Sequence, residues 1–100
     1  MIRGTTPTHI FNVDFDTTTI KEVKISYYQE GEEILVKRTE DCTIQNGTIE
    51  TNLSQEETFL FDNTKFANIQ VRILTLGNDA LASSIMSVSV KECLDDEVLV

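Results

Sequence analysis

Residues 66–90 have the sequence FANIQVRILTLGNDALASSIMSVSV, and both halves of this segment alternate between two kinds of side chain. Alternate positions of the first half are Ala67, Ile69, Val71 and Ile73, and those of the second half are Ala82, Ser84, Met86, Val88 and Val90. Between the halves lies Gly77-Asn78-Asp79, whose residue types favour tight turns. A two-residue loop there pairs odd positions with even ones, so both apolar series share one face. The segment therefore predicts a β-hairpin of two long strands.

A second hairpin is predicted upstream, over residues 21–29 and 32–38, because apolar and polar side chains alternate on both sides of Glu30-Gly31. A two-residue turn at this point places Tyr27 opposite Ile34 and also Ile25 opposite Val36. This register turns Leu35 to the other face of the sheet, beside Ser26.

A third hairpin is predicted over residues 41–45 and 48–53, because Asn46-Gly47 is the preferred sequence of a type I′ turn. This turn makes Ile44 and Ile49 cross-strand neighbours. The two strands are short and rich in threonine, so we expect them at a sheet edge. Another strand with one buried face is expected over residues 8–15, where Phe11, Val13 and Phe15 alternate with mostly polar residues.

Ser54 and Glu57 have the spacing of a capping box, which predicts one helical turn near residues 54–58. Phe59 or Phe61 would then close one end of the core. About seven strands with tight turns in 100 residues predict an all-β fold: an antiparallel two-sheet sandwich, immunoglobulin-like in broad architecture, with a small closed barrel as the alternative. The expected organisation is an irregular lead-in at 1–7, the sandwich at 8–92, and an acidic and apolar tail at 93–100.

The charge balance argues against two classes of partner. The chain has 17 acidic and eight basic residues and a formal net charge of −9. The basic residues are scattered along the sequence, whereas phosphate binding needs them clustered, so we expect no nucleic acid and no anionic membrane surface as partner. Residues 1–7 contain no apolar run of signal-peptide length, and no segment reaches the length of a membrane span. We therefore expect the cytoplasm at synthesis, and free thiols at Cys42 and Cys93.

A search for catalytic and metal-binding patterns predicts no such site. His9 is the only histidine and would have to act as a base beside Cys42 or Cys93, which is a formal dyad only. One histidine and two distant cysteines cannot form a zinc site. Calcium would need a cluster of carboxylates. The carboxylates near turns and in the tail do not match an EF-hand loop. They are Asp14, Asp16, Asp62, Asp79, Asp95, Asp96 and Glu97. We therefore predict no catalytic residue, no metal and no cofactor, and a protein that is not an enzyme.

The two tyrosines, Tyr27 and Tyr28, lie in one predicted strand and point to opposite faces. They cannot form the continuous aromatic platform that a carbohydrate cleft uses. One should belong to the core, and the other could be exposed as an interface anchor.

The chain resembles a group of small, uncharacterised proteins of phages and prophage-like elements of Gram-positive bacteria over nearly its full length. The resemblance is one of overall pattern and rests on MIRGTTPT (1–8), FDT (15–17), IKEV (20–23), EDCT (40–43), LSQEET (53–58), IQVRIL (69–74), ALAS (80–83) and CLDDEVL (93–99). It implies a small virion-assembly component of the tail or baseplate type, whose partners are copies of itself or other virion proteins, and it implies no active-site residues.

Three hypotheses of function follow from these observations. The first is a non-enzymatic structural or protein-interaction module of a phage particle. The second is a ligand- or carbohydrate-binding β-sandwich module. The third is a small enzyme, or a phage-encoded inhibitor of a host protein.

Overall fold

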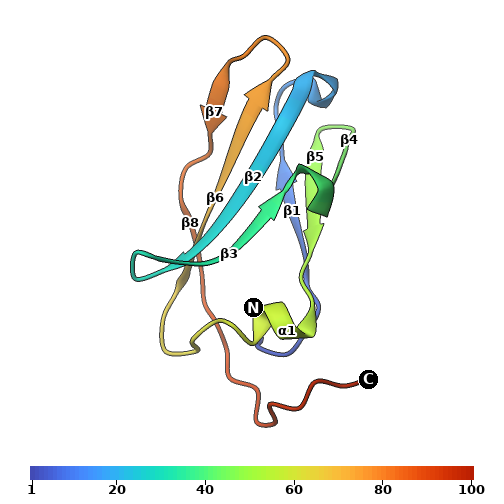
Figure 1. The fold of residues 1–100 in the computed structure, drawn as a ribbon. Helices are drawn as coiled ribbons and strands as arrows, with labels where there is room; N and C mark the ends of the chain where they lie inside the picture. The colour runs from blue at the N-terminus through green and yellow to red at the C-terminus, as the bar shows by residue number, and fades with distance from the viewer.

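The computed structural model describes residues 1–100 and consists of eight strands in two antiparallel sheets (Figure 1). The strands are β1 (Thr8–Asn12), β2 (Ile20–Gln29), β3 (Glu32–Arg38), β4 (Cys42–Gln45), β5 (Thr48–Asn52), β6 (Ala67–Thr75), β7 (Ala80–Ala82) and β8 (Met86–Val88). Helical structure is limited to α1 (Gln55–Thr58) and two 3₁₀ turns, η1 (Thr17–Thr19) and η2 (Thr39–Asp41). The prediction of an all-β, antiparallel two-sheet sandwich is confirmed.

The strand order is that of an immunoglobulin-type sandwich without its first strand. One sheet has the order β1-β5-β4, and the other has the order β3-β2-β6-β7, with β8 also paired to β6. These orders correspond to strands B-E-D and C′-C-F-G of the immunoglobulin fold, in which strand A would lie beside β1. The N-terminal segment contributes only an isolated parallel bridge between Ile2 and Lys91.

The β4–β5 hairpin forms as its turn sequence predicts. Asn46 and Gly47 both have positive φ, 49° and 81°, as a type I′ turn requires, and Ile44 lies opposite Ile49. Strand β4 is at a sheet edge, as expected. The expectation was wrong for β5, which lies between β4 and β1 because its inward side chains Ile49 and Thr51 are buried on a core-facing surface.

The predicted register of the β2–β3 hairpin was wrong. Tyr28 pairs with Glu33, but Tyr27 pairs with Leu35, so Ile34 is an extra residue that forms a β-bulge. From this point on, Leu35 and Lys37 take the positions that Ile34 and Val36 would occupy, and Lys37 lies opposite Ile25. The bulge thereby turns Lys37 to the inner face, where it is 8% exposed.

The segment of residues 66–90 differs from the predicted hairpin in two ways. Its loop has three residues, with Asn78 at φ 66° and a hydrogen bond from the Thr75 N–H to the Asp79 carbonyl, so Ile73 pairs with Leu81. The second strand is also interrupted at residues 83–85 and divides into β7 and β8. This interruption adds one residue to that side, and beyond it the predicted odd–even pairing holds: Ala67 with Val88 and Ile69 with Met86. The three-residue loop places Ala82 opposite Arg72 on the outer face, and Ser84 lies within the interruption, so both are exposed and do not face the core as predicted.

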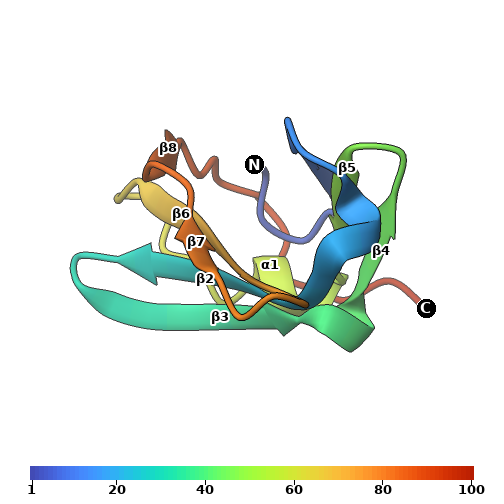
Figure 2. The ribbon, with the colours of Figure 1, turned by 90° about the horizontal axis from the view of Figure 1, so that it is seen from above.

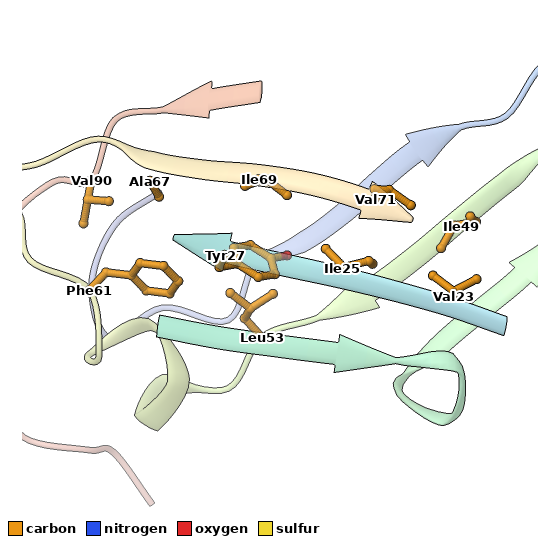
Figure 3. Packing of buried hydrophobic residues seen from close by; sticks show 10 residues of the cluster. All are labelled: Val23, Ile25, Tyr27, Ile49, Leu53, Phe61, Ala67, Ile69, Val71 and Val90. Atoms are coloured by element: carbon orange, nitrogen blue, oxygen red, sulfur yellow. The ribbon is translucent and has the colours of Figure 1, made fainter. Parts of the chain in front are cut away.

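The core lies between the sheets and is closed at one end by α1 and the residues after it (Figure 3). Tyr27 is fully buried and meets Phe61 edge to face, with ring centroids 5.8 Å apart. The capping box of α1 is confirmed, since the Ser54 hydroxyl accepts from the Glu57 N–H and the Glu57 carboxylate accepts from the Ser54 N–H. Of the two phenylalanines considered for this end of the core, Phe61 is buried.

Both chain ends contact the sandwich. The backbones of Met1 and Arg3 are hydrogen-bonded to that of Lys91, and the Gly4 N–H donates to the buried hydroxyl of Thr58. In the tail, the side-chain amide of Gln55 both donates to the carbonyl and accepts from the N–H of Leu99, at 2.9 and 2.8 Å.

Candidate functional site

A groove of about 490 Å³ opens between the two sheets on the side of β1, β7 and β8. Figure 2 shows the sheets joined through η2 on the β3–β4 side and separated on the opposite side. Ten of the 13 lining residues are hydrophobic, and the full set is Ile10, Phe11, Asn12, Val13, Asp14, Phe15, Ile49, Val71, Ile73, Leu81, Ala82, Ser83 and Met86. The groove is therefore an accessible extension of the apolar core.

Two strand edges without a pairing strand border this groove. Strand β1 pairs only with β5, while β7 and β8 pair only with β6. Strand β1 also ends at Asn12, three residues earlier than predicted, so Val13 and Phe15 line the groove from a segment outside any strand. The outward N–H and C=O groups of these edges are available to an additional strand, in the place that strand A takes in an immunoglobulin domain.

The only histidine lies on the inner face of β1, at the core. Nδ1 of His9 is hydrogen-bonded to the Tyr27 hydroxyl at 2.7 Å, and the two rings are 5.6 Å apart. Burial lowers the pKa of His9, and the positive N-terminal ammonium lowers it further. Burial likewise raises the pKa of Tyr27. Both groups are therefore neutral near pH 7, and each provides the other with a hydrogen-bond partner inside the sandwich.

The structure does not bring His9 together with either cysteine. His9 pairs with Thr51 on β5, which in turn pairs with Cys42 on β4, so one strand separates the two side chains. Cys93 lies in the tail, where its thiol contacts the Asp95 carbonyl. Both cysteines are free thiols, as expected. The arrangement lacks the contact between nucleophile and base on which the enzyme hypothesis depends.

Two of the turn carboxylates considered for calcium bond to their own turns. Asp16 accepts from the N–H and hydroxyl of Thr18, and Asp62 does the same with Thr64. These hydrogen bonds lower the pKa of both carboxyl groups. No three carboxylate, histidine or cysteine side chains lie close enough together to hold a metal ion.

The tyrosines point to opposite faces, as the strand period predicts. Tyr27 is buried, and Tyr28 is half-buried with its hydroxyl 3.1 Å from Glu33 on the next strand. Neither contributes to the groove, whose aromatic residues are Phe11 and Phe15.

One charged feature could not be found by reading along the sequence. Lys24 pairs with Arg38 on one side and with Arg72 on the other, so three of the eight basic residues form one row across β3, β2 and β6. Along the sequence Lys24 and Arg38 are 14 residues apart, and Arg38 and Arg72 are 34 residues apart. Only the strand pairing brings the three together. The description of the basic residues as scattered is correct for the sequence and wrong for the sheet.

Comparisons with known proteins add no assignment: no protein-family model, curated protein or solved structure matches the chain. The resemblance to small phage and prophage proteins therefore stays a prediction. The structure contains no helix long and apolar enough to cross a membrane.

Proposed function

We propose that the protein is a non-enzymatic protein-interaction module that binds an extended segment of a partner protein in the groove between β1 and β7–β8. The observation that carries this proposal is the combination of an apolar groove with two strand edges that lack a pairing strand. An added strand would bond its backbone to these edges and place alternate side chains on the apolar floor. The partner segment should therefore have apolar residues at every second position.

The resemblance to phage and prophage proteins supports a role in a phage particle, where the partners would be virion proteins. We propose that the module is a small virion-assembly component, of the tail or baseplate type, made in the bacterial cytoplasm and incorporated into the particle. Assembly by strand addition suits such a component, because backbone hydrogen bonds supply affinity without a catalytic site.

Incorporation is tested by tagging the chain in its host, inducing particle production and measuring its copy number per purified particle by mass spectrometry. A fixed copy number supports the proposal. A chain that is abundant in the lysate but missing from the particles contradicts the virion role. That result would leave an inhibitor of a host protein as the alternative reading of the same groove.

The groove is tested with two matched variants, Ile10→Lys and Leu60→Lys. Both side chains are 56% exposed, but only Ile10 lines the groove. Peptides tiled over the other particle proteins are screened for binding, and hydrogen exchange is followed on the bound chain. Strand addition should protect amides of β1 and of β7–β8, and Ile10→Lys should weaken binding at least about tenfold while Leu60→Lys does not. Equal binding by both variants would reject the groove.

A ligand-binding role is the second candidate, because the groove volume lies within the range of small-molecule sites. Its lining favours an apolar ligand and not a carbohydrate, since only Asn12, Asp14 and Ser83 are polar. A small ligand would fill the groove without protecting the strand edges, so the same exchange experiment distinguishes the two roles.

A further inference from the structure

Three cations stand side by side on the outer face of the five-stranded sheet, and we call Arg38, Lys24 and Arg72 the basic row. Neighbouring strands are about 4.8 Å apart, and the pairing places Lys24 directly between the two arginines. The side chains point away from the core, because Lys37 and Val71, which precede the two arginines in sequence, are buried. The row is thus a local concentration of positive charge on a protein with a net charge of −9.

None of the three cations forms an ion pair. The basic residues in ion pairs are Arg3, Lys37 and Lys65. Glu22 and Glu40 line the same pocket as the row, but neither lies within ion-pair distance of a cation, so the pocket has three positive and two negative side chains. Like charges directly opposite each other destabilise a sheet, so the isolated protein carries an electrostatic cost that a bound anion would relieve.

The row borders a pocket of about 310 Å³. The pocket also contains an apolar wall, to which Leu74, Ala80 and Leu81 contribute. A fitting ligand therefore combines several negative charges with at least one apolar group. An acidic peptide segment that includes a leucine has this chemistry, whereas inorganic phosphate has only the charge.

The C-terminal tail contains such a segment. Leu94 is 98% exposed, and Asp95, Asp96 and Glu97, which follow it, are exposed as well. Residues 92–98 lie between two attachments, the bridge from Lys91 to Ile2 and the bonds between Leu99 and Gln55. Their only ion pair is the 3.8 Å contact of Asp96 with Arg3, in which the Asp96 side chain stays 77% exposed.

We propose that the basic row of one copy binds residues 94–97 of a second copy. Three carboxylates then meet three cations, and Leu94 meets the apolar wall. The proposal rests on the assembly role proposed above and names a second copy as partner. The pocket at the basic row adjoins the groove, because Ile73 and Leu81 line both, but the three cations line only this pocket.

The basic row and the tail lie toward opposite ends of the molecule. Arg72 pairs with Ala82 of β7, whereas the tail leaves the sandwich at the far end from β7 (Figure 1). A contact between two different surfaces joins copies head to tail, and it closes into a ring or continues as a filament. Because exposed ion pairs contribute little each, we expect a dissociation constant of about 1 mM for one contact, strengthened when several act together in an assembly.

Binding is tested by NMR with a synthetic peptide of residues 91–100 and the full-length chain. The chain carries Asp95→Asn, Asp96→Asn and Glu97→Gln, so that its own tail is neutral and does not compete with the peptide. The expected shifts are at the amides of the basic row. Lys24→Gln with Arg72→Gln should weaken binding at least about tenfold. The control Lys21→Gln removes one positive charge from β2 outside the pocket and should change affinity less than about twofold. No shift up to several millimolar peptide, or equal affinity of both variants, overturns the proposal.

The head-to-tail arrangement is tested by sedimentation of two full-length chains, one with the neutralised row and one with the neutralised tail. Their mixture retains one working contact and should form only 1:1 dimers, which dissociate in 0.5 M salt, whereas the unmodified chain forms longer species. A mixture that stays monomeric while the unmodified chain associates overturns it. Tighter binding of inorganic phosphate or single-stranded DNA than of the peptide also overturns it. Ile10→Lys should leave this binding unchanged, which separates failure here from failure of the groove.

Discussion

Lys37 Nζ lies 2.8 Å from both carboxylate oxygens of Glu57, and the two side chains are only 10% and 26% exposed. The pair joins β3 to the start of α1, where Glu57 also accepts from the Ser54 N–H. Burial raises the pKa of Glu57, but the hydrogen bonds and charge of Lys37 and the bond from Ser54 outweigh it and hold that pKa below its usual range. The pair exists because the bulge at Ile34 turns Lys37 inward.

Removing one partner of this pair should destabilise the fold. In Glu57→Gln a neutral amide faces the Lys37 ammonium, and we expect the free energy of unfolding to fall by about 2–3 kcal/mol. Lys37→Met replaces the cation by an apolar chain of similar length and should cost less, about 1–2 kcal/mol, because Glu57 retains partial access to water. Urea denaturation followed by circular dichroism measures both values.

The matched control is Lys65→Met, which removes the more exposed ion pairs with Glu30 and Asp62. Exposed pairs contribute about 0–1 kcal/mol, so the unfolding free energy should change by no more than about 0.5 kcal/mol. If Glu57→Gln cost no more than Lys65→Met, the buried pair would have no special structural role.

What could be predicted from the sequence depended on signals carried by a few neighbouring residues. Asn46-Gly47 adopts the positive φ angles of a type I′ turn, and in the capping box the Ser54 and Glu57 side chains bond to backbone N–H groups; both form as predicted. The bulge at Ile34 adds one residue to a strand without any turn residue to mark it, and the interruption at residues 83–85 is marked only by two serines, which are weak turn signals.

The bulge exchanges the two faces of β3 beyond it. The three-residue loop after Thr75 does the same for β7, and the interruption at residues 83–85 then restores the predicted pairing in β8. For these reasons Leu35 was predicted on the wrong face, and Ala82 was predicted to face inward. The basic row was missed for a related reason, because it is a property of the register between three strands. The partnership of His9 with Tyr27 likewise joins the two sheets and has no local signal.

The attachment of the N-terminal segment should depend on Gly4. This residue has φ +78°, and a Cβ at its position would lie 2.5 Å from the Phe59 ring. Gly4→Ala should therefore combine backbone strain with a clash and lower the free energy of unfolding by about 2–4 kcal/mol. Gly31→Ala is the matched control, since Gly31 has φ +77° but open space around its Cβ position, and it should cost only about 1 kcal/mol. Equal losses in thermal or urea denaturation would show that the segment is not held against Phe59.

Stability should fall as the pH drops below about 6.5, the ordinary pKa of histidine, because the pKa of His9 is lower in the folded protein. Above that pH His9 is neutral in both states and contributes nothing to the pH dependence. Between the two pKa values the unfolded chain binds a proton that the folded chain does not, so acid favours unfolding. Urea midpoints between pH 7.5 and pH 5 should decrease for the unmodified chain and stay level for His9→Gln.

A second loss should begin below about pH 4.5, the ordinary pKa of glutamate, because the folded-state pKa of Glu57 is lowered. Here the carboxylate contributes stability that is lost as it becomes protonated in the folded protein. His9→Gln should retain this second transition, and Glu57→Gln should reduce it. A single transition that is unchanged in both variants would contradict the assignment of the two groups.

The two free thiols should react at different rates with Ellman's reagent at pH 8. Burial raises the pKa of Cys42 most, while a hydrogen bond from Thr51 lowers it and the Asp41 charge raises it again, so little reactive thiolate forms. Cys93 lies in the tail, near the exposed segment proposed to bind the basic row. We expect two phases that differ about tenfold in rate, with Cys93→Ser removing the fast phase and Cys42→Ser the slow one. If copies join head to tail through residues 94–97, the fast phase should also slow at high protein concentration and recover in 0.5 M salt; a rate independent of both would argue against that contact.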